Sequence, residues 1–167
     1  MPRIDLPEGE PLYTWMSYRP EMAPGVAALS DAAYTKSQLP LRIREIVRFR
    51  VALSNDCTVC QRSRSAKADE GGVTEDLYEG VKDWRNHDGF SPREKMAAEF
   101  AERFTTDHLG MDDAFFVRLR EQFDDGEIVD LGICCLAFLT GRLLKVLEVD
   151  DSCVLTLDQP TPVTASA

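Results

Sequence analysis

Two helix-start signals in the second half of the chain constrain its fold more than any other feature. Ser91 is followed by Pro92 and then by Glu94, and Asp124 is followed at the same spacing by Glu127. A serine or aspartate with a glutamate three positions later forms a capping box, and proline is favoured at the first helical position. Both signals precede apolar residues at helical spacing, so each predicts the start of an amphipathic or buried helix.

Helical spacing continues through most of the chain, and no convincing pair of strands stands out. We expect helices at about residues 25–36, 40–54, 57–71, 74–82, 92–104, 113–123 and 128–147. The last of these is strongly apolar but carries Asp130, Arg142 and Lys145, which is typical of a core or interface helix and not of a membrane span. The predicted fold class is therefore all-α, a bundle of about six to seven helices.

The domain organisation predicted from these patterns is simple. Residues 1–24 hold several prolines and are expected to form an extended N-terminal arm over the body, residues 25–150 a single helical domain, and residues 151–167 a frayed C-terminal tail. A chain of 167 residues fits one such domain.

Charge excludes two classes of partner. The chain has 29 acidic against 19 basic residues and a net charge of −10, so its summed field repels nucleic acid and anionic membrane surfaces. The first residues lack a basic region followed by an apolar run, and no stretch is long and apolar enough to span a bilayer. We therefore expect a cytoplasmic protein with no nucleic-acid or membrane partner.

The five cysteines do not form an even disulfide framework, so free thiols in a reducing compartment are expected. His87 and His108 stand alone, and Cys134 and Cys135 lie in an apolar segment where packing is the simpler role. Zinc needs a second cysteine or histidine pair at ligand spacing. We therefore expect no metal and no cofactor.

Cys57 and Cys60 are the candidate chemical centre. Two thiols three positions apart at the start of a helix lie on one face and can close a short disulfide. The helix N-terminus favours the thiolate of Cys57, whereas the carboxylate of Asp56 opposes it. The pair predicts dithiol redox chemistry.

Glu45 and Arg64 are the other candidate site residues. If helices 40–54 and 57–71 form an antiparallel hairpin, Glu45 lies level with Arg64 and can hold its guanidinium in a bidentate pair one turn from Cys60. Arg48, three positions after Glu45, offers that carboxylate an ordinary ion pair instead. Arginine does not accept a proton at neutral pH, so any proton relay needs Glu45, water or a distant histidine.

The segment from residue 40 to residue 72, with Glu45, Cys57 and Cys60, resembles the carboxymuconolactone decarboxylase and AhpD-like alkylhydroperoxidase family. The resemblance extends loosely to residue 150 and implies a helical fold assembled as trimers or hexamers. In the AhpD-like branch it implies a CxxC that reduces peroxides with the help of a glutamate and a histidine relay. By this comparison Cys60 attacks the peroxide and Cys57 resolves the product, whereas helix position alone favours Cys57 as the attacking thiol.

Two positions depart from that pattern. Arg64 stands where the family has a histidine, and Val59 stands where it often has another. A histidine relay contributes proton transfer worth roughly two to four orders of magnitude in rate. We therefore expect a redox-active dithiol with slow peroxidase turnover.

Three functional hypotheses follow from the sequence. The first is a thiol-dependent oxidoreductase that uses Cys57 and Cys60, consumes a hydroperoxide and is regenerated by an external dithiol. The second is a lyase that acts on a small lactone or acid through Glu45 and Arg64 without thiol chemistry. The third is a non-catalytic helical oligomer that binds a small ligand. The first is favoured.

Overall fold

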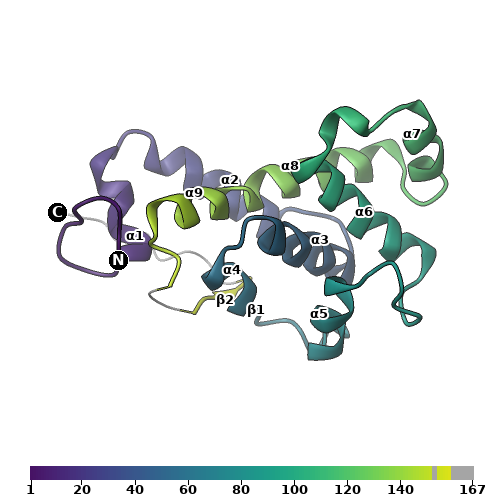
Figure 1. Ribbon diagram of the computed structural model, residues 1–167, viewed down its shortest axis with the longest axis horizontal. Helices are drawn as coiled ribbons and strands as arrows, with labels where there is room; N and C mark the ends of the chain where they lie inside the picture. Colours follow the sequence, from purple (N-terminus) through teal and green to yellow (C-terminus); the bar gives the residue numbers. More distant parts are fainter. Residues whose placement is uncertain (152–153, 159–167) are drawn as a thin grey trace.

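The computed structural model describes residues 1–151 and 154–158 and is predominantly helical (Figure 1). The longer helices are α2 (Ala23–Thr35), α3 (Leu41–Ser54), α6 (Pro92–Thr106) and α8 (Asp125–Phe138). The shorter elements are α1 (Pro11–Thr14), η1 (Trp15–Tyr18), α4 (Thr58–Arg62), β1 (Arg64–Ser65), α5 (Glu75–Lys82), η2 (His108–Gly110), α7 (Asp113–Arg120), α9 (Thr140–Leu147) and β2 (Thr156–Leu157). The predicted all-α class is confirmed.

Helix α3 lies at the centre of the bundle. It packs against α4, α5, α6 and α8, which surround it on several sides (Figure 1). Its apolar residues Ile46, Val47 and Val51 are completely buried, and so are the side chains of Glu45 and Arg48. Because α3 is enclosed on most sides, its buried charged side chains must be paired inside the protein.

Both predicted capping boxes are present. The Ser91 hydroxyl accepts the Glu94 N–H at 3.3 Å, and the Glu94 carboxylate accepts the Ser91 N–H at 2.9 Å. Asp124 and Glu127 make the same exchange at 2.8 and 3.1 Å. A helix cap of this kind stabilises by about 1 kcal/mol, so the two boxes fix where α6 and α8 begin.

The sequence predicted one helix over the apolar segment 128–147. The structure has two helices there, α8 and α9, which are separated at Leu139. Two carbonyls that a continuous helix would satisfy are taken by side chains. Asn55 Nδ2 donates to the Phe138 carbonyl at 3.1 Å, and Thr140 Oγ1 donates to the Ala137 carbonyl at 2.8 Å. The break lets α9 turn toward the chain around Asn55. Across the described residues no helix has both the length and the apolar character needed to cross a membrane.

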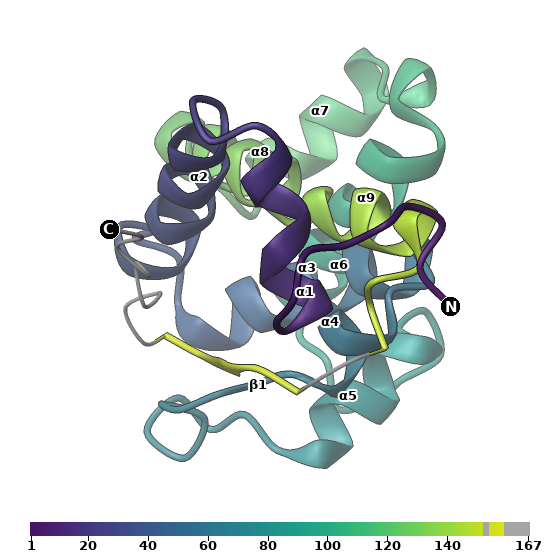
Figure 2. The same cartoon turned by 90° about the vertical axis from the view of Figure 1, so that its left-hand side faces the viewer.

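Part of the predicted arm and part of the predicted tail lie in helices and a strand. The N-terminal arm is only partly extended, because Pro11 occupies the first turn of α1 and η1 follows directly. Strand β2 pairs in parallel with β1, a strand pair that the sequence did not indicate (Figure 2). Asp158 anchors this segment by pairing with Arg44 and accepting the Ser65 hydroxyl. The rest of the predicted tail, residues 152–153 and 159–167, lies outside the described residues.

Candidate functional site

Cys57 and Cys60 form a disulfide at the start of α4, with their Cα atoms 5.3 Å apart. Cys57 is the N-cap of this helix, and its sulfur accepts the Cys60 N–H at 3.4 Å. The structure therefore brings the two thiols together on one face, as their spacing predicted.

The helix that carries them is much shorter than predicted, because α4 ends at Arg62 and not near residue 71. Ser63 adopts an extended conformation, and its hydroxyl donates back to the Val59 carbonyl at 2.6 Å. Its carbonyl accepts Arg48 Nη2 at 3.1 Å, and the chain then enters β1. These side-chain bonds replace the next helical turn, so the predicted hairpin of two long helices does not exist.

The two cysteines differ in exposure. Cys57 is completely buried, whereas Cys60 is partly exposed and borders a cavity of about 460 Å³. The cavity is lined mainly by apolar side chains from the N-terminal arm, α2, α8, α9 and the C-terminal segment, among them Leu12, Trp15, Val26, Phe138, Leu144 and Leu155. A small apolar molecule in this cavity reaches the Cys60 side of the disulfide, not the Cys57 side.

Gly141 brings α9 against the disulfide. A Cβ atom at this position would lie 2.7 Å from Cys60 Sγ and 3.2 Å from Cys57 Sγ. Distances below 3.0 Å are not tolerated without movement of one of the two groups. The absent side chain of Gly141 is therefore what lets the helix cover the two sulfur atoms.

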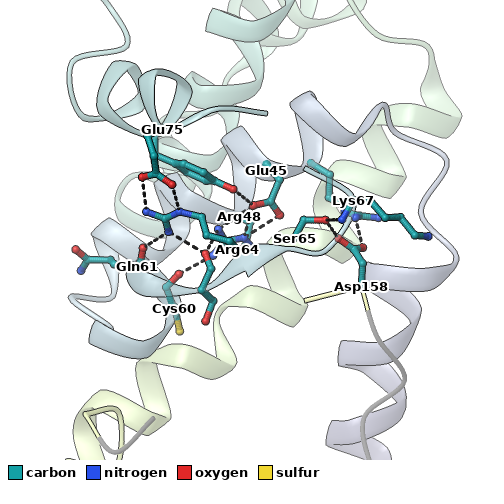
Figure 3. Close-up of polar contacts among 12 residues, drawn as sticks. Glu45, Arg48, Cys60, Gln61, Arg64, Ser65, Lys67, Glu75 and Asp158 are labelled. Atoms are coloured by element: carbon teal, nitrogen blue, oxygen red, sulfur yellow. Dashed lines mark hydrogen bonds and ion pairs between the residues drawn. The ribbon is translucent and has the colours of Figure 1, made fainter. Parts of the chain in front are cut away.

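A buried charged cluster lies behind Cys60 (Figure 3). The Glu45 carboxylate accepts Arg48 Nε at 2.9 Å and Nη2 at 2.8 Å, and it also accepts the Tyr78 hydroxyl at 2.8 Å. Arg48 Nη1 donates to the Cys60 carbonyl at 2.6 Å, and Arg48 also lines the cavity. Arg48 thus links the buried carboxylate to the CxxC segment.

The electrostatics of this cluster keep Arg48 charged. Burial disfavours the cation, but the Glu45 carboxylate outweighs it and raises the pKa of the Arg48 guanidinium above its ordinary value. Burial, aided by the Glu45 charge, also raises the pKa of Tyr78, so its phenol stays neutral and donates to Glu45. Spacing along the chain predicted only an ordinary ion pair between Arg48 and Glu45, because spacing does not indicate burial.

Arg64 does not pair with Glu45, so the predicted contact is wrong. Its Nε and Nη2 atoms donate to the Glu75 carboxylate at 2.7 and 2.9 Å, and its guanidinium lies 4.1 Å from the centroid of the Tyr78 ring (Figure 3). The early end of α4 turns the side chain toward α5. Among the described residues that line the cavity, neither Glu45 nor Arg64 is found.

The histidines lie elsewhere. The His87 ring packs against the Phe90 ring at a tilt of 42°, with the centroids 4.5 Å apart, and His108 is exposed in η2. Neither is among the described cavity residues, whereas Tyr34 is, and burial raises the pKa of its phenol. Within residues 1–151 and 154–158, no group of three or more histidine, cysteine or acidic side chains is arranged to hold a metal ion.

Two further cysteines, Cys134 and Cys135, lie in α8 and are buried. Burial raises the pKa of the Cys134 thiol to about 12 and raises that of Cys135 as well. A thiol reacts as its thiolate, so these side chains contribute packing and not redox chemistry. Cys153 lies outside the described residues.

Comparison with known proteins is consistent with this geometry. Residues 20–103 match the carboxymuconolactone decarboxylase family. The chain is 33% identical over 115 residues to the uncharacterised protein YdfG of Bacillus subtilis, an alignment that covers 66% of this chain and 78% of YdfG.

Two solved structures share the fold. One is a protein of unknown function from Agrobacterium tumefaciens that has been proposed as an AhpD antioxidant defence protein, with a TM-score of 0.72, 22% identity, and coverage of 89% of this chain and 96% of that one. The other is an uncharacterised peroxidase-related protein from Ralstonia eutropha with an AhpD core, with a TM-score of 0.71, 20% identity, and coverage of 91% and 77%.

Proposed function

The chain belongs to the carboxymuconolactone decarboxylase family, and we propose that it is an AhpD-like, thiol-dependent oxidoreductase that reduces small apolar hydroperoxides. The observation that carries this proposal is the Cys57–Cys60 disulfide, which borders an apolar cavity through Cys60 alone. An apolar cavity favours an organic hydroperoxide over hydrogen peroxide because burial of its hydrocarbon part contributes binding free energy.

The proposed reaction has four steps. The Cys60 thiolate attacks the terminal oxygen of ROOH, the O–O bond breaks, and a sulfenic acid and an alkoxide form. The alkoxide takes a proton to give ROH. The Cys57 thiol then condenses with the sulfenic acid to give the disulfide and water, and an external dithiol reduces that disulfide by exchange.

Cys60 is assigned the attack because it borders the cavity and Cys57 is buried. Arg48 is paired with Glu45, and the positive end of this ion pair faces the Cys60 carbonyl and the cavity wall, which favours the thiolate. Glu45 acts as a positioning residue that holds Arg48, and Arg64 supports it indirectly through the Tyr78 ring.

A proton donor for the alkoxide is needed, since no histidine is near. Tyr34 lines the cavity and stays protonated because burial raises its pKa. We assign it, with water, the donation that histidine makes in the AhpD-like pattern. The lyase hypothesis has less support, because Glu45 and Arg64 are engaged by Arg48 and Glu75 and are not placed to hold a substrate together.

Assembly is a second part of the proposal. Val129, Ile133 and Leu136 form an exposed apolar stripe on α8, and Leu143 and Val146 are exposed on α9. Apolar side chains at this spacing on a helix are typical of an interface between copies. Sedimentation should therefore give an oligomer, a trimer or hexamer by family resemblance, and Ile133→Asp should dissociate it. Val117→Asp, an exposed α7 control, should not; a monomeric wild type contradicts this part.

The test of function is a thiol count on the reduced protein before and after one equivalent of cumene hydroperoxide. The proposal predicts the loss of two thiols per chain in the wild type and the loss of one in Cys57→Ser. Hydrogen peroxide is the comparison oxidant and should act more slowly. If the wild type keeps all of its thiols, the proposed function is wrong.

A further inference from the structure

We propose that Asp150 is a positioning residue that sets the reduction potential of the Cys57–Cys60 pair by placing a fixed negative charge at the start of α4. The Asp150 carboxylate accepts the Thr58 N–H at 2.7 Å, and its backbone carbonyl accepts the Val59 N–H at 2.8 Å. Asp150 is only 4% exposed. The inference rests on the proposed function in one respect, that the pair cycles between disulfide and dithiol.

The position of Asp150 is defined by the end of α9. Glu148 adopts a left-handed conformation at the C-cap, with φ of 54°, and the chain turns back so that Asp150 reaches α4. Asp150 lies outside residues 20–103, the part that matches the family. This contact is therefore a feature of the C-terminal segment of this chain and not of the matched CxxC region.

The N–H groups that Asp150 engages are the ones that a thiolate at a helix start normally uses. The first N–H groups of a helix have no partner within it, and they favour an anion at that end. Thr58 and Val59 provide the first two of them in α4, and both are bonded to Asp150. Cys57 Sγ keeps only the Cys60 N–H, at 3.4 Å. A carboxylate thus occupies the place from which the helix would stabilise a thiolate.

The other charges around the pair are balanced or exposed. Asp56, which is exposed, is paired with the partly exposed Lys145 at 3.0 Å. Arg62 pairs with the exposed Asp151 at 2.8 Å.

Arg48 is buried but is neutralised by Glu45, and Arg142 donates to Asn55 at 3.1 Å. Asp150, in contrast, has no ion pair among the described residues. Lys145 interacts with the Asp150 carboxylate electrostatically without forming an ion pair with it, so Asp150 is a buried carboxylate bonded directly to the start of the CxxC helix.

The Asp150 charge shifts the equilibrium between the disulfide and the dithiol in a defined direction. Reduction of the disulfide takes two electrons and two protons and gives two thiols, one of which ionises above its pKa. The Asp150 carboxylate disfavours that thiolate and so disfavours the reduced state at high pH. When both thiols are protonated, the two redox states carry the same charge and the effect disappears. Asp150 therefore makes the potential more negative, and increasingly so as pH rises through the thiol pKa.

The test compares Asp150→Asn with Asp151→Asn. The asparagine oxygen can still accept the Thr58 N–H, and the backbone bond to Val59 is independent of the side chain, so the local fold is retained. Asp151→Asn removes the same charge from the next residue, which is exposed and bonds Arg62 instead. Each variant is equilibrated with reduced and oxidised glutathione between pH 5.5 and 8.5, and its disulfide fraction is measured.

In Asp150→Asn we expect the pKa of the first thiol of the pair to ionise to fall by about one to two units, because a buried carboxylate at the start of α4 is removed. At pH 8.5 the equilibrium should move toward the dithiol by about tenfold, or about 30 mV. At pH 5.5 the shift should vanish, and Asp151→Asn should resemble the wild type. Asp150→Ser, with a smaller neutral acceptor, should shift in the same direction.

A shift of equal size at every pH, or an equal shift in Asp151→Asn, would show that Asp150 only anchors the loop and would overturn the inference. A wild-type pair that glutathione does not oxidise would also overturn it. Failure of the proposed function is distinguishable, because a protein that ignores hydroperoxide can still show the pH-dependent Asp150 shift with glutathione.

Discussion

Gly141→Ala tests how the fold accommodates the disulfide. The added Cβ would lie 2.7 Å from Cys60 Sγ and 3.2 Å from Cys57 Sγ, so the oxidised protein has to move a sulfur atom or α9. In the disulfide, Cys60 Sγ is covalently held and cannot rotate away. In the reduced protein it is free to turn toward the cavity that it borders. The substitution should therefore penalise the oxidised state more than the reduced state.

The size of this effect follows from the cost of overpacking. An extra methyl group in a filled site costs about 1–3 kcal/mol. If most of this cost falls on the oxidised state, disulfide formation becomes about 5- to 150-fold less favourable, which raises the reduction potential by about 20–65 mV. The reduced protein should keep its stability or gain up to about 1 kcal/mol, because alanine is favoured over glycine in a helix.

Equilibration with glutathione and urea unfolding of both redox forms measure these quantities. Gly132→Ala is the matched control, because a Cβ at Gly132 in α8 meets no atom within 4 Å. It should change stability by helix propensity alone and leave the potential unchanged. A Gly141→Ala potential equal to that of the wild type, or a shift shared with Gly132→Ala, would refute the packing argument.

Three further predictions follow from the buried and titrating groups. Tyr78→Phe removes the hydroxyl that donates to Glu45, so urea unfolding at pH 7 should show a loss of about 1–3 kcal/mol, and an unchanged midpoint would contradict the buried bond. The Cys134 thiol, whose pKa burial raises to about 12, should resist iodoacetamide at pH 8 and react only in denaturant, as peptide mass spectrometry can establish. Hydrogen bonds from Arg118 lower the pKa of Glu99 below its unfolded value near 4.3, so its stabilisation is present above that value and is lost as pH falls. Glu99→Gln should therefore destabilise at pH 7 and have no effect near pH 2, which unfolding curves at both pH values would check.

Local signals in the sequence predicted the helices well. Ser91 and Asp124 fixed the starts of α6 and α8 because a cap depends on residues within one turn. The C-terminal ends of the helices were predicted less well. Helix α4 stops at Arg62 because Arg48, far away in sequence, takes the Ser63 carbonyl, and α8 stops at Phe138 because Asn55 takes its carbonyl. Tertiary hydrogen bonds of this kind leave no local signal.

The site was predicted in the same uneven way. The Cys57–Cys60 pair was predicted correctly because the two cysteines are only three positions apart, so local helix geometry brings them together. The predicted Glu45–Arg64 contact was wrong because the predicted hairpin required α4 to continue, whereas the alternative ion pair of Glu45 with Arg48 is present. Asp150 and Gly141 were missed for a related reason. Their contacts with the CxxC depend on the path of the chain after Asn55 and after α9, which spacing along the sequence does not encode.

The central claim is that Cys60, facing the apolar cavity, is the thiol that meets the substrate. The most direct measurement is trapping of the sulfenic acid with dimedone after one equivalent of cumene hydroperoxide, located by peptide mass spectrometry in Cys57→Ser and in Cys60→Ser. The account predicts a dimedone adduct on Cys60 in Cys57→Ser and no adduct on Cys57 in Cys60→Ser. An adduct on Cys57, or none in either variant, would contradict it.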